Sequence, residues 1–472
     1  MKKLISLITL ITVTASILTI QSPIAHAASN RGVAINVNGK RLHPDVPPFI
    51  KNGRTLVPLR GIFEELGSTV EWVPEGQRVI VKYKDKNINL QIGNKTASIN
   101  GNTATIDVAP LIDNSRTMIP LRFIAEKMGM NVQWVPEAGL ATITDPGYFD
   151  NLPRNTVLGF TTNDYLGDNA PHGSLLKYGS NVNAIATFSY QLETSGDLKL
   201  TGQSQARSVD HANSNNIKPL VLIHNFRNGN FDRSLSHTVL SDAAKRQKLI
   251  NNILVIMSKE EYAGVNIDIE NVDWTDRQNY TALIRDLKKK LEPYGFLTTV
   301  SIPAKTSDTY RNNSWSGGFD YIEIGKYADK ILLMTYDEHY FGGTPGPIAS
   351  LPWVENVLKY ATSVIDSKKL LLGIPAYGYD WSGKGNKAVT FKSADSLLAD
   401  YNVQSSWDDS AKSPYFSYVK DGTTHQVWYE NSQSLSYKLP LVAKYQLGGI
   451  GIWKLGYDND AFWETIKAGL GQ

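Results

Sequence analysis

The stretch that decides the fold is Gly264-Val265-Asn266-Ile267-Asp268-Ile269-Glu270. Apolar and polar residues alternate along it, and the side chains of a β-strand alternate between its two faces. Asn266, Asp268 and Glu270 therefore share one face of a predicted strand. On a half-buried edge strand this face would be solvated, whereas in a parallel barrel it points inward, toward the end where such barrels hold their active sites. The stretch alone leaves both interpretations open.

The chain around this stretch favours the barrel. Apolar strand candidates alternate with helical patterns such as 241–261 and 277–291. Eight strands are predicted, at 157–161, 184–190, 219–225, 264–270, 297–303, 330–337, 370–375 and 449–455. Eight buried strands with helical crossovers predict an α/β fold, a (β/α)8 TIM barrel over residues 155–472.

A small α+β insertion is expected between strands seven and eight, at about residues 380–440. It contains Trp381, Tyr415-Phe416 and Trp428-Tyr429 with turn residues between them. The insertion either walls one side of a cleft or forms a stabilising flap with its own aromatic core.

An internal repeat precedes the barrel. Asn52-Gly-Arg-Thr-Leu-Val-Pro-Leu-Arg60 matches Asn114-Ser-Arg-Thr-Met-Ile-Pro-Leu-Arg122 at an offset of 62 residues. Each copy, at 33–83 and 95–145, predicts a small α+β unit: a strand with an Asn-Gly turn, a short helix and a strand carrying Trp.

The repeats resemble the N-terminal domain of copper amine oxidases, a stalk-like repeat found on secreted proteins of Gram-positive bacteria. The name implies no copper here, because the region holds His43 and no cysteine, which is no metal-ligand set. Attachment to the cell wall and a purely structural role are equally open.

The N-terminus predicts export. Lys2-Lys3, an apolar run to about Ile20 and Ala25-His26-Ala27 are typical of a secretory signal peptide, assigned to residues 1–27. An uncleaved membrane anchor is the alternative. We expect a secreted, extracellular protein, associated with the cell wall or spore of a Gram-positive bacterium, with no membrane partner after cleavage.

Composition excludes several classes of function. The chain has no cysteine, which excludes disulfides, lipid attachment and thiolate metal sites. The net charge of +3 falls to +1 without the two leader lysines (3 − 2 = 1). A nearly neutral mature chain argues against a nucleic-acid partner held by bulk charge.

Polar and aromatic residues follow the ends of several predicted strands, where the strands of a parallel barrel converge on one pocket. They are Phe188, Tyr190, His224, Asn225, Met334, Tyr336, Asp337, Tyr377 and Trp453. Carboxylates among aromatic rings suit a sugar, because the rings stack on its apolar faces while its hydroxyls form hydrogen bonds. We expect no phosphorylated substrate, metal or cofactor, since neither a phosphate loop nor metal-ligand spacing is present. His224, Asn225 and Tyr377 have residue types and positions more often structural than catalytic.

Three segments carry a second resemblance: 264–270, Met334-Thr335-Tyr336-Asp337 and Gly451-Ile452-Trp453. Over about residues 157–468 the chain resembles glycoside hydrolase family 18, the chitinase-like family, and within it the bacterial spore and cell-wall branch. The family pattern at the first segment is Asp-Gly-x-Asp-x-Asp-x-Glu. Ala263 stands at its first acid and Asn266 at its second, while Asp268 and Glu270 match. The loss of the first acid casts doubt on efficiency more than on the chemistry.

The resemblance implies a retaining, substrate-assisted mechanism in which the 2-acetamido oxygen of the substrate attacks the anomeric carbon. Glu270 would be the general acid, Asp268 would orient the acetamido group, and Tyr336 would donate a hydrogen bond to its carbonyl. Residues assigned to substrate binding are Asp337, Trp453, Met334, Asn266, Tyr190 and Tyr377.

The expected substrate is an N-acetylated glycan, with peptidoglycan or spore cortex favoured over a chitin-like polymer. Two alternatives come from other classes of protein. One is a lectin-like, catalytically inactive barrel that only binds carbohydrate. The other treats the repeats as the functional part, with possible cell-wall attachment through them, and the barrel as their support.

Overall fold

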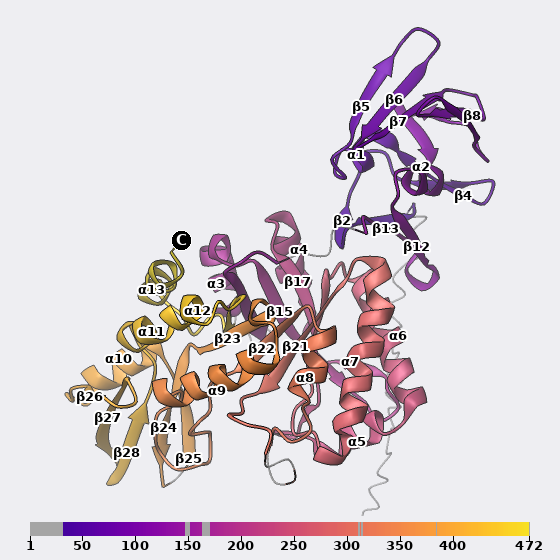
Figure 1. The fold of residues 1–472 in the computed structure, drawn as a ribbon. Helices are drawn as coiled ribbons and strands as arrows, with labels where there is room; N and C mark the ends of the chain where they lie inside the picture. The colour runs from indigo at the N-terminus through magenta and orange to yellow at the C-terminus, as the bar shows by residue number, and fades with distance from the viewer. Residues whose placement is uncertain are drawn as a thin grey trace, which may run out of the picture.

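The computed structural model describes residues 32–146, 152–162, 170–309, 312, 315–383 and 385–471. An N-terminal body of short strands stands on one end of a larger α/β body (Figure 1). The predicted signal peptide at 1–27 lies outside the described residues.

Eight parallel strands form the larger body. They are β14 (Thr156–Thr162), β15 (Ala184–Leu192), β17 (Lys218–His224), β20 (Gly264–Asp268), β21 (Leu297–Pro303), β22 (Lys330–Met334), β23 (Leu370–Pro375) and β29 (Gly449–Trp453). Hydrogen bonds from β14 to both β15 and β29 close the sheet. The (β/α)8 barrel is therefore confirmed, and β20 lies inside the sheet between β17 and β21, not at an edge. Three predicted strands run two or three residues too far, because the chain leaves the barrel there as loops.

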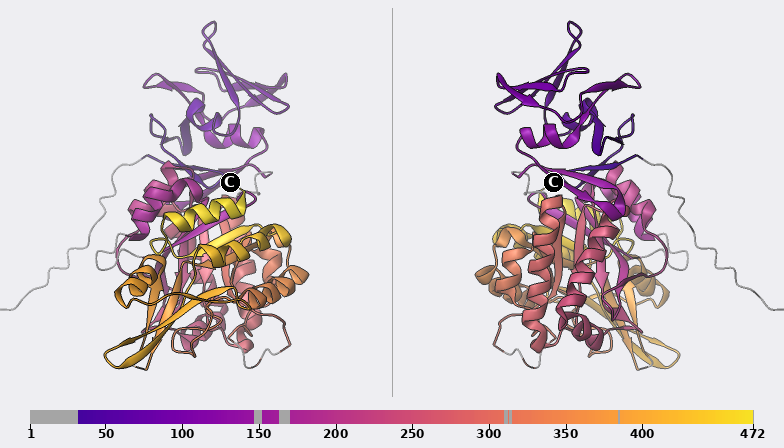
Figure 2. Two further views of the ribbon diagram at one scale, coloured as in Figure 1. Left: turned by 90° about the vertical axis from the view of Figure 1, so that its left-hand side faces the viewer. Right: turned by 90° about the vertical axis from the view of Figure 1, so that its right-hand side faces the viewer.

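Helices cover the outside of the barrel (Figure 2). They are α3 (Ala170–Tyr178), α4 (Ala206–Ser214), α5 (Arg233–Leu240), α6 (Ala243–Lys259), α7 (Arg277–Leu291), α8 (Tyr321–Tyr327), α9 (Leu351–Val364), α11 (Ser432–Lys438), α12 (Pro440–Lys444) and α13 (Asp460–Leu470). Among the described residues, no helix combines the length and the apolarity needed to cross a bilayer.

The alternation along β20 sorts its side chains between two cores. Val265 and Ile267 pack outward into the large apolar cluster between the strands and the helices. Leu222, which pairs with Asn266 from the neighbouring strand β17, belongs to a separate apolar cluster with barrel residues such as Leu158 and Ala186. The polar face of β20 consequently points inward, as a closed barrel requires.

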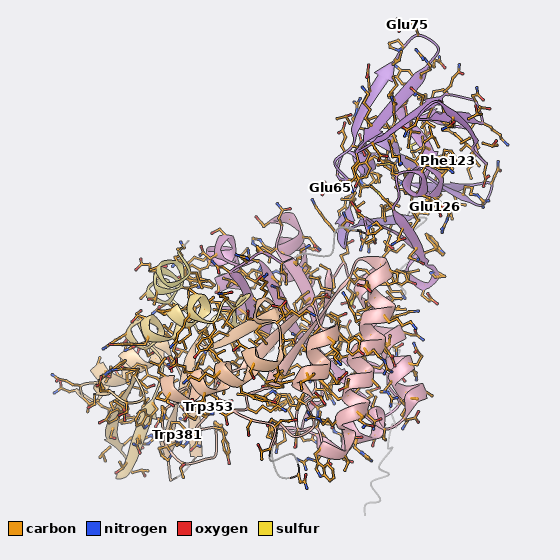
Figure 3. All side chains as sticks on the ribbon, in the orientation of Figure 1. Glu65, Glu75, Phe123, Glu126, Trp353 and Trp381 are labelled. Atoms are coloured by element: carbon orange, nitrogen blue, oxygen red, sulfur yellow. The ribbon has the colours of Figure 1, made fainter. Side chains whose placement is uncertain are left out.

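The insertion between β23 and β29 is a five-stranded sheet with one helix. Its elements are β24 (Tyr377–Ser382), β25 (Gly385–Thr390), α10 (Phe391–Asp400), β26 (Ser406–Asp408), β27 (Ser413–Lys420) and β28 (Thr423–Trp428). One cluster of its residues, including Phe416 and Val427, forms a core of its own. A second cluster, with Trp381 (labelled in Figure 3), packs against Tyr336 and Trp453 at the barrel. The insertion thus has a core of its own and also forms a wall beside the barrel, which are the two roles expected for it.

The N-terminal body interlocks its two sequence copies. Its elements are β1 (Ala34–Val37), β2 (Lys40–Leu42), β3 (Phe49–Lys51), β4 (Arg54–Pro58), α1 (Leu59–Phe63), β5 (Thr69–Val73), β6 (Arg78–Tyr83), β7 (Lys86–Gln91), β8 (Thr96–Ile99), β9 (Asn102–Thr105), β10 (Leu111–Asp113), β11 (Arg116–Pro120), α2 (Leu121–Lys127), β12 (Asn131–Val135) and β13 (Leu140–Thr144). The sheets β12-β13-β1-β2 and β10-β11-β4-β3 each mix strands from both copies. The repeat in sequence is therefore one folded body rather than two separate units.

Two ion pairs follow the same exchange between copies. The Nε of Arg54 lies 2.6 Å from Oδ2 of Asp107, and the Nε of Arg116 lies 2.8 Å from Oδ2 of Asp45. Both partners are related by the 62-residue offset of the repeat, so each arginine binds the aspartate of the other copy. Because these ion pairs are exposed, they contribute little to the free energy of folding. Their equivalence shows that the two copies are related by pseudo-symmetry within the body.

The N-terminal body docks on the barrel end at which the strands begin. Val135 and Leu140 belong to the same apolar cluster as the outer face of the barrel. The Arg41 guanidinium donates to the carbonyl oxygen of Ser258, and its Nε lies 3.6 Å from Oε1 of Glu261, just before β20. This end lies opposite the one where Asp268 and Glu270 end their strand.

Candidate active site

The polar face of β20 leads from the barrel interior to its rim. Asp268, paired with His224 in the parallel register with β17, is 4% exposed. Glu270 follows where the strand has ended, and it keeps part of its surface accessible. The next residue, Asn271, has φ of 52°, in the left-handed region that asparagine tolerates. The chain thus turns away immediately after placing the Glu270 carboxyl at the rim.

Asn225 fixes the backbone of Glu270. Its Oδ1 accepts from the Glu270 N–H at 2.9 Å, and its Nδ2 donates to the Glu270 carbonyl oxygen at 2.9 Å. The same Nδ2 donates to the carbonyl oxygen of Asp232 at 3.1 Å. The Asn225 side chain is fully buried, and both its oxygen and its nitrogen are hydrogen-bonded, so it is held rigidly. This residue at the end of β17 is therefore structural, and its role is to fix the backbone of Glu270.

Trp315 reaches the Glu270 carboxyl from the other side. Its indole Nε1 donates to Oε2 of Glu270 at 3.3 Å. This residue is not predicted from the sequence, because the loop between β21 and α8 matches no motif. The one available signal was a lone tryptophan followed by Ser316-Gly317-Gly318, just after a predicted barrel strand.

The electrostatics of the two carboxyl groups favour protonation. Desolvation raises the pKa of Glu270 well above its usual range, the charges of Asp268 and Asp337 raise it further, and the hydrogen bond from Trp315 opposes them. Desolvation also raises the pKa of Asp268. Because the two groups repel each other when both are ionised, the pair tends to share one proton.

The loop after β22 brings Tyr336 and Asp337 to the same rim. Desolvation, and next the charges of Asp268 and Glu270, keep the pKa of Tyr336 well above its usual value, so its hydroxyl remains a donor. The φ of Asp337 is 60°. Its Oδ1 accepts from the hydroxyls of Tyr377 at 2.5 Å and Tyr379 at 3.0 Å, which fixes the carboxyl.

Gly373, on β23, makes room for the Tyr336 ring. A Cβ at this position would stand 2.9 Å from Cε1 of Tyr336 and 2.4 Å from the carbonyl oxygen of Leu333. No side chain fits in that space without displacing the backbone or the tyrosine.

Apolar groups complete the rim. The ring of Trp453 lies 5.6 Å from that of Phe160 and 5.9 Å from that of Phe188, between ring centres. Met334 and Trp453 are partly buried against the inner apolar cluster. The predicted Trp453 and Met334 therefore lie, with Phe188, at the same end of the barrel as the carboxyl groups, where their parallel strands end.

Asn266 and Tyr190, both expected to bind sugar, do not reach the rim. Asn266 is fully buried: its Nδ2 donates to Oγ1 of Thr299 at 3.0 Å, and its Oδ1 accepts from Oγ of Ser301 at 2.9 Å. An amide with both ends satisfied inside the barrel has no surface for a ligand.

Tyr190 points to the outside of the barrel. Its hydroxyl donates to Oε1 of Glu260, and its ring belongs to the outer apolar cluster. The pairing of β15 with β17 shifts by one residue between Phe188 and Tyr190. A one-residue shift exchanges the faces of a strand, which explains why simple alternation misplaced this tyrosine.

His224 is a satisfied core residue. Its ring stacks on Phe188 at 4.0 Å between centres, and its Nδ1 accepts from the Phe226 N–H at 3.1 Å. Burial lowers the pKa of His224 to about 3, so the ring stays neutral at physiological pH.

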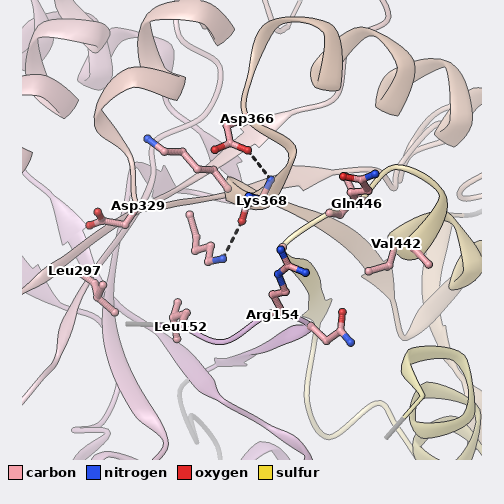
Figure 4. A pocket seen from close by; sticks show the side chains of 14 residues that line it. Leu152, Arg154, Leu297, Asp329, Asp366, Lys368, Val442 and Gln446 are labelled. Carbon is pink, nitrogen blue, oxygen red and sulfur yellow. Dashed lines mark hydrogen bonds between the residues drawn. The ribbon is translucent and has the colours of Figure 1, made fainter. Parts of the chain in front are cut away.

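A cavity of about 590 Å³ lies at the opposite end of the barrel (Figure 4). It is bordered by the first residues of β21 and β22, by Lys368 and Lys369 just before β23, and by Arg154. The Nζ of Lys330 donates there to the carbonyl oxygen of Lys368 at 2.8 Å. None of the predicted site residues lines this cavity. Nor do the described residues contain any group of three or more His, Cys, Asp or Glu side chains arranged for a metal ion.

A closed (β/α)8 barrel that gathers carboxyl groups, a tyrosine and aromatic rings at the carboxyl ends of its strands has the architecture of a barrel glycosidase. Family profiles agree with this class. The family described as "Glycosyl hydrolases family 18" matches residues 168–458, and "Copper amine oxidase N-terminal domain" matches residues 36–143. The chain belongs to glycoside hydrolase family 18.

Individual relatives support the same assignment. The chain is 34% identical over 319 residues to the "Uncharacterized glycosylase YvbX" of Bacillus subtilis, which covers 66% of this chain and 91% of that protein. A chitinase from Chromobacterium violaceum superposes with a TM-score of 0.63 at 31% identity, over 67% of this chain and 99% of the other. The spore cortex-lytic enzyme SleL of Bacillus cereus gives 0.63 at 28% identity, over 67% and 75%. The chain is therefore a glycosidase, and the lectin-like alternative is not favoured.

Proposed function

We propose that this protein is a secreted hydrolase of peptidoglycan or spore cortex that cleaves after N-acetylglucosamine by substrate-assisted catalysis. One observation carries the mechanism: the two carboxyl groups of the site come from the same strand, two residues apart. Side chains so placed lie on one side of a bound sugar. They cannot act as an acid on one face and a separate nucleophile on the other, so the substrate supplies the nucleophile.

Glu270 is the proposed general acid. Its carboxyl proton passes to the glycosidic oxygen as the acetamido carbonyl oxygen of the same sugar attacks the anomeric carbon, and the bond to the leaving sugar breaks. In the second half of the cycle a water attacks the anomeric carbon, the bond from that carbon to the acetamido oxygen breaks and restores the acetamido group, and the Glu270 carboxylate takes the proton of the water. The raised pKa of Glu270 supports this role, because the acid must be protonated when the substrate binds.

Asp268 and Tyr336 are proposed to hold the acetamido group. The Asp268 carboxylate accepts from the acetamido N–H and balances the positive charge that develops on the cyclic intermediate. The Tyr336 hydroxyl, which stays protonated, donates to the acetamido oxygen. Asp337, Met334 and Trp453 are proposed sugar contacts, and Tyr377 acts by holding Asp337 in place.

The choice of glycan rests on the relatives. The names of the Bacillus cereus enzyme and the Chromobacterium violaceum enzyme point to spore cortex and to chitin, respectively. The N-terminal body, whose sequence resembles a repeat found on secreted proteins of Gram-positive bacteria, supports the wall polymer. Cleavage after N-acetylglucosamine is favoured because the lactyl ether of N-acetylmuramic acid would crowd the acetamido-binding residues. Secretion through the predicted leader and wall attachment through the repeats belong to the same proposal.

Digestion of purified peptidoglycan and of chitin oligomers, with mass analysis of the reducing ends, tests this function. We expect N-acetylglucosamine at the new reducing ends of peptidoglycan fragments. Glu270→Gln should lower turnover by about 10²–10⁴, through loss of general acid catalysis, with binding largely kept. Glu261→Gln, which alters a carboxyl at the other end of the barrel, is the matched control.

Three outcomes would overturn parts of the proposal. Equal activity of the wild type and Glu270→Gln would exclude Glu270 as the acid. Muramic acid at the new reducing ends would reverse the preferred bond. Turnover of chitin oligomers alone would assign the chitin-like substrate.

A further inference from the structure

The indole of Trp315 touches the proposed acid directly. Its Nε1–H donates to Oε2 of Glu270 at 3.3 Å, while 44% of the residue remains exposed. A large aromatic side chain that binds a carboxyl group and still faces solvent is poised for a role at the site. The following inference rests on the proposed role of Glu270.

A network centred on Arg277 fixes the chain beside Trp315. The Arg277 Nη1 donates to the carbonyl oxygens of Gly317 at 3.1 Å and Phe319 at 2.9 Å. Its Nη2 binds Asp308 at 2.7 Å, and its Nε binds Asp320 at 3.0 Å. Five donors in a rigid fork suit a hub of this kind. The backbone just after Trp315 is thereby attached to the first turn of α7.

Lys305 and Gly318 reinforce the same segment. The Lys305 Nζ donates to the Phe319 carbonyl oxygen at 2.6 Å and binds Asp308 at 2.8 Å. A Cβ at Gly318 would stand 2.5 Å from the carbonyl oxygen of Val272, so the segment lies directly against the loop that follows Glu270. The packed backbone that follows Trp315 therefore holds this residue next to Glu270, although its side chain is exposed.

Glu270 is consequently held from two directions. Asn225 binds its backbone from β17, and Trp315 binds Oε2 from the β21 side. An indole N–H can only donate, so it occupies Oε2 as an acceptor and leaves Oε1 to carry the proton. We propose that Trp315 is the positioning residue of the acid, selecting the carboxyl oxygen that donates, and that its exposed ring face receives the leaving-side sugar.

The charges around Glu270 determine how the hydrogen bond from Trp315 affects its pKa. Asp268 and Asp337 face Glu270 and disfavour its ionised form, whereas Tyr336 and His224 are neutral nearby. A donor binds a carboxylate more strongly than a carboxylic acid. Trp315 therefore stabilises Glu270 after proton transfer and moderates its raised pKa, which would otherwise hold the proton too tightly.

The location of the indole assigns the sugar that it contacts. The proton of Glu270 goes to the oxygen of the leaving sugar, so a ring that touches the same carboxyl stands next to that sugar. In the proposed function, Trp453, Tyr336 and Met334 contact the other sugar, whose anomeric carbon reacts. Stacking on the exposed indole face would therefore affect the leaving sugar selectively.

Three variants separate the two parts of the proposal. Trp315→Phe keeps an aromatic ring but removes the N–H, and Trp315→Ala removes both. Trp274→Phe is the control, because Trp274 is 45% exposed on a neighbouring loop and makes no hydrogen bond to Glu270 among the described contacts. The readouts are kcat and KM as a function of pH, on peptidoglycan fragments and on N-acetylglucosaminides with small aryl leaving groups.

Trp315→Phe should lower kcat about 10-fold and move the alkaline limb of the kcat profile to higher pH, because an interaction that favours the ionised acid is lost. Its KM should hardly change. Trp315→Ala should show the same shift and, in addition, raise KM for glycan fragments but not for aryl leaving groups. Trp274→Phe should match the wild type in every readout.

An unchanged alkaline limb in both Trp315 variants would overturn the positioning role, and equal losses on long and short leaving groups would overturn the sugar contact. These failures are distinguishable from failure of the proposed function. In that case the wild type itself would be inactive on N-acetylated glycans, or Glu270→Gln would remain active. Thermal melts of each variant report whether lower activity reflects unfolding.

Discussion

The two ends of the barrel differ in how their carboxyl groups are paired. At the carboxyl ends of the strands, Asp268 and Glu270 stand together without ion-pair partners among the described contacts, and desolvation raises the pKa of each. At the amino ends, Arg41 and His43 lie against Glu261, at 3.6 and 3.3 Å. At the carboxyl end of the barrel, unpaired carboxyl groups with raised pKa values are available for chemistry. At the amino end, the Glu261 carboxyl group is paired where the N-terminal body docks.

Packing follows the same division. At the docking end, two glycines with left-handed backbones meet, and a Cβ on Gly39 would stand 2.6 Å from the carbonyl oxygen of Gly295. At the rim, by contrast, the Trp315 side chain next to Glu270 stays 44% exposed. Substitutions at the two ends should therefore separate effects on activity from effects on stability, as barrels of this class generally allow.

After Glu270→Gln, the largest expected effect comes from Asp268. Asp268→Asn removes the proposed counter-charge of the acetamido group and should lower kcat by about 10²–10³, while the thermal midpoint holds or rises. Glu261→Gln, at the docking end, should leave kcat unchanged. Steady-state kinetics and thermal melts on both variants measure the contrast. A loss of kcat in Glu261→Gln as large as in Asp268→Asn would abolish the distinction between the two ends.

The next effect comes from the glycine contact. Gly39→Ala combines an unfavourable φ of 78° with a clash against Gly295, and should reduce the free energy of unfolding by about 2–5 kcal/mol. Gly67→Ala has the same φ of 78° but nothing within 4 Å of the new Cβ, so only about 1–2 kcal/mol should be lost. Denaturant melts compare the two. Equal losses would show that the interface is not tightly packed at Gly39.

A smaller effect is expected at Arg41. Its side chain is 6% exposed and binds the Ser258 carbonyl oxygen and Glu261. Arg41→Ala leaves the buried Ser258 carbonyl oxygen without this donor, removes the pair with the 30% exposed Glu261 side chain, and should reduce stability by about 1–3 kcal/mol. Arg60→Ala, which breaks an exposed pair with Glu64, should cost less than about 0.5 kcal/mol. Both variants should retain wild-type kcat below their melting temperatures.

The smallest effect concerns pH and sharpens the comparison at the rim. The folded pKa of Glu270 is raised, so the native state binds more protons than the unfolded chain once pH exceeds about 4.5. Glu270 therefore costs stability increasingly as pH rises through this window toward its folded pKa. Glu270→Gln does not titrate, so its thermal midpoint should exceed that of the wild type at pH 7 but not at pH 4. A constant difference between the two pH values would contradict the raised pKa.

Much of this architecture could be predicted because it follows from local patterns. The alternation along β20, the apolar runs of the other strands and the spacing of the helices together predict a closed parallel barrel, and the motif residues Asp268, Glu270 and Tyr336 lie at its rim. Prediction failed where a tertiary detail overrides the pattern. The irregular pairing of β15 turned Tyr190 outward, and the partners on β21 buried Asn266.

Contacts between residues that are far apart in the sequence could not be predicted from it. Trp315 reaches Glu270 across 45 residues of chain, from a loop with no motif. Asn225 was expected to be structural, but nothing in its sequence context indicates that both ends of its amide clamp the acid. The mixing of strands between the two repeats is equally invisible, because each copy alone carries every signal of a separate unit.

The parallel pairing of β1 with β13 bears on how far the N-terminal body can hold the enzyme from an attachment point. Ala34 lies opposite Leu140 and Val37 opposite Ile143, so the chain enters and leaves this body about one strand length apart. A spacer must take the chain in at one end and release it at the other. This body instead stands on the barrel end at which the strands begin (Figure 1), with its entry and exit close together, so it adds little reach along the chain.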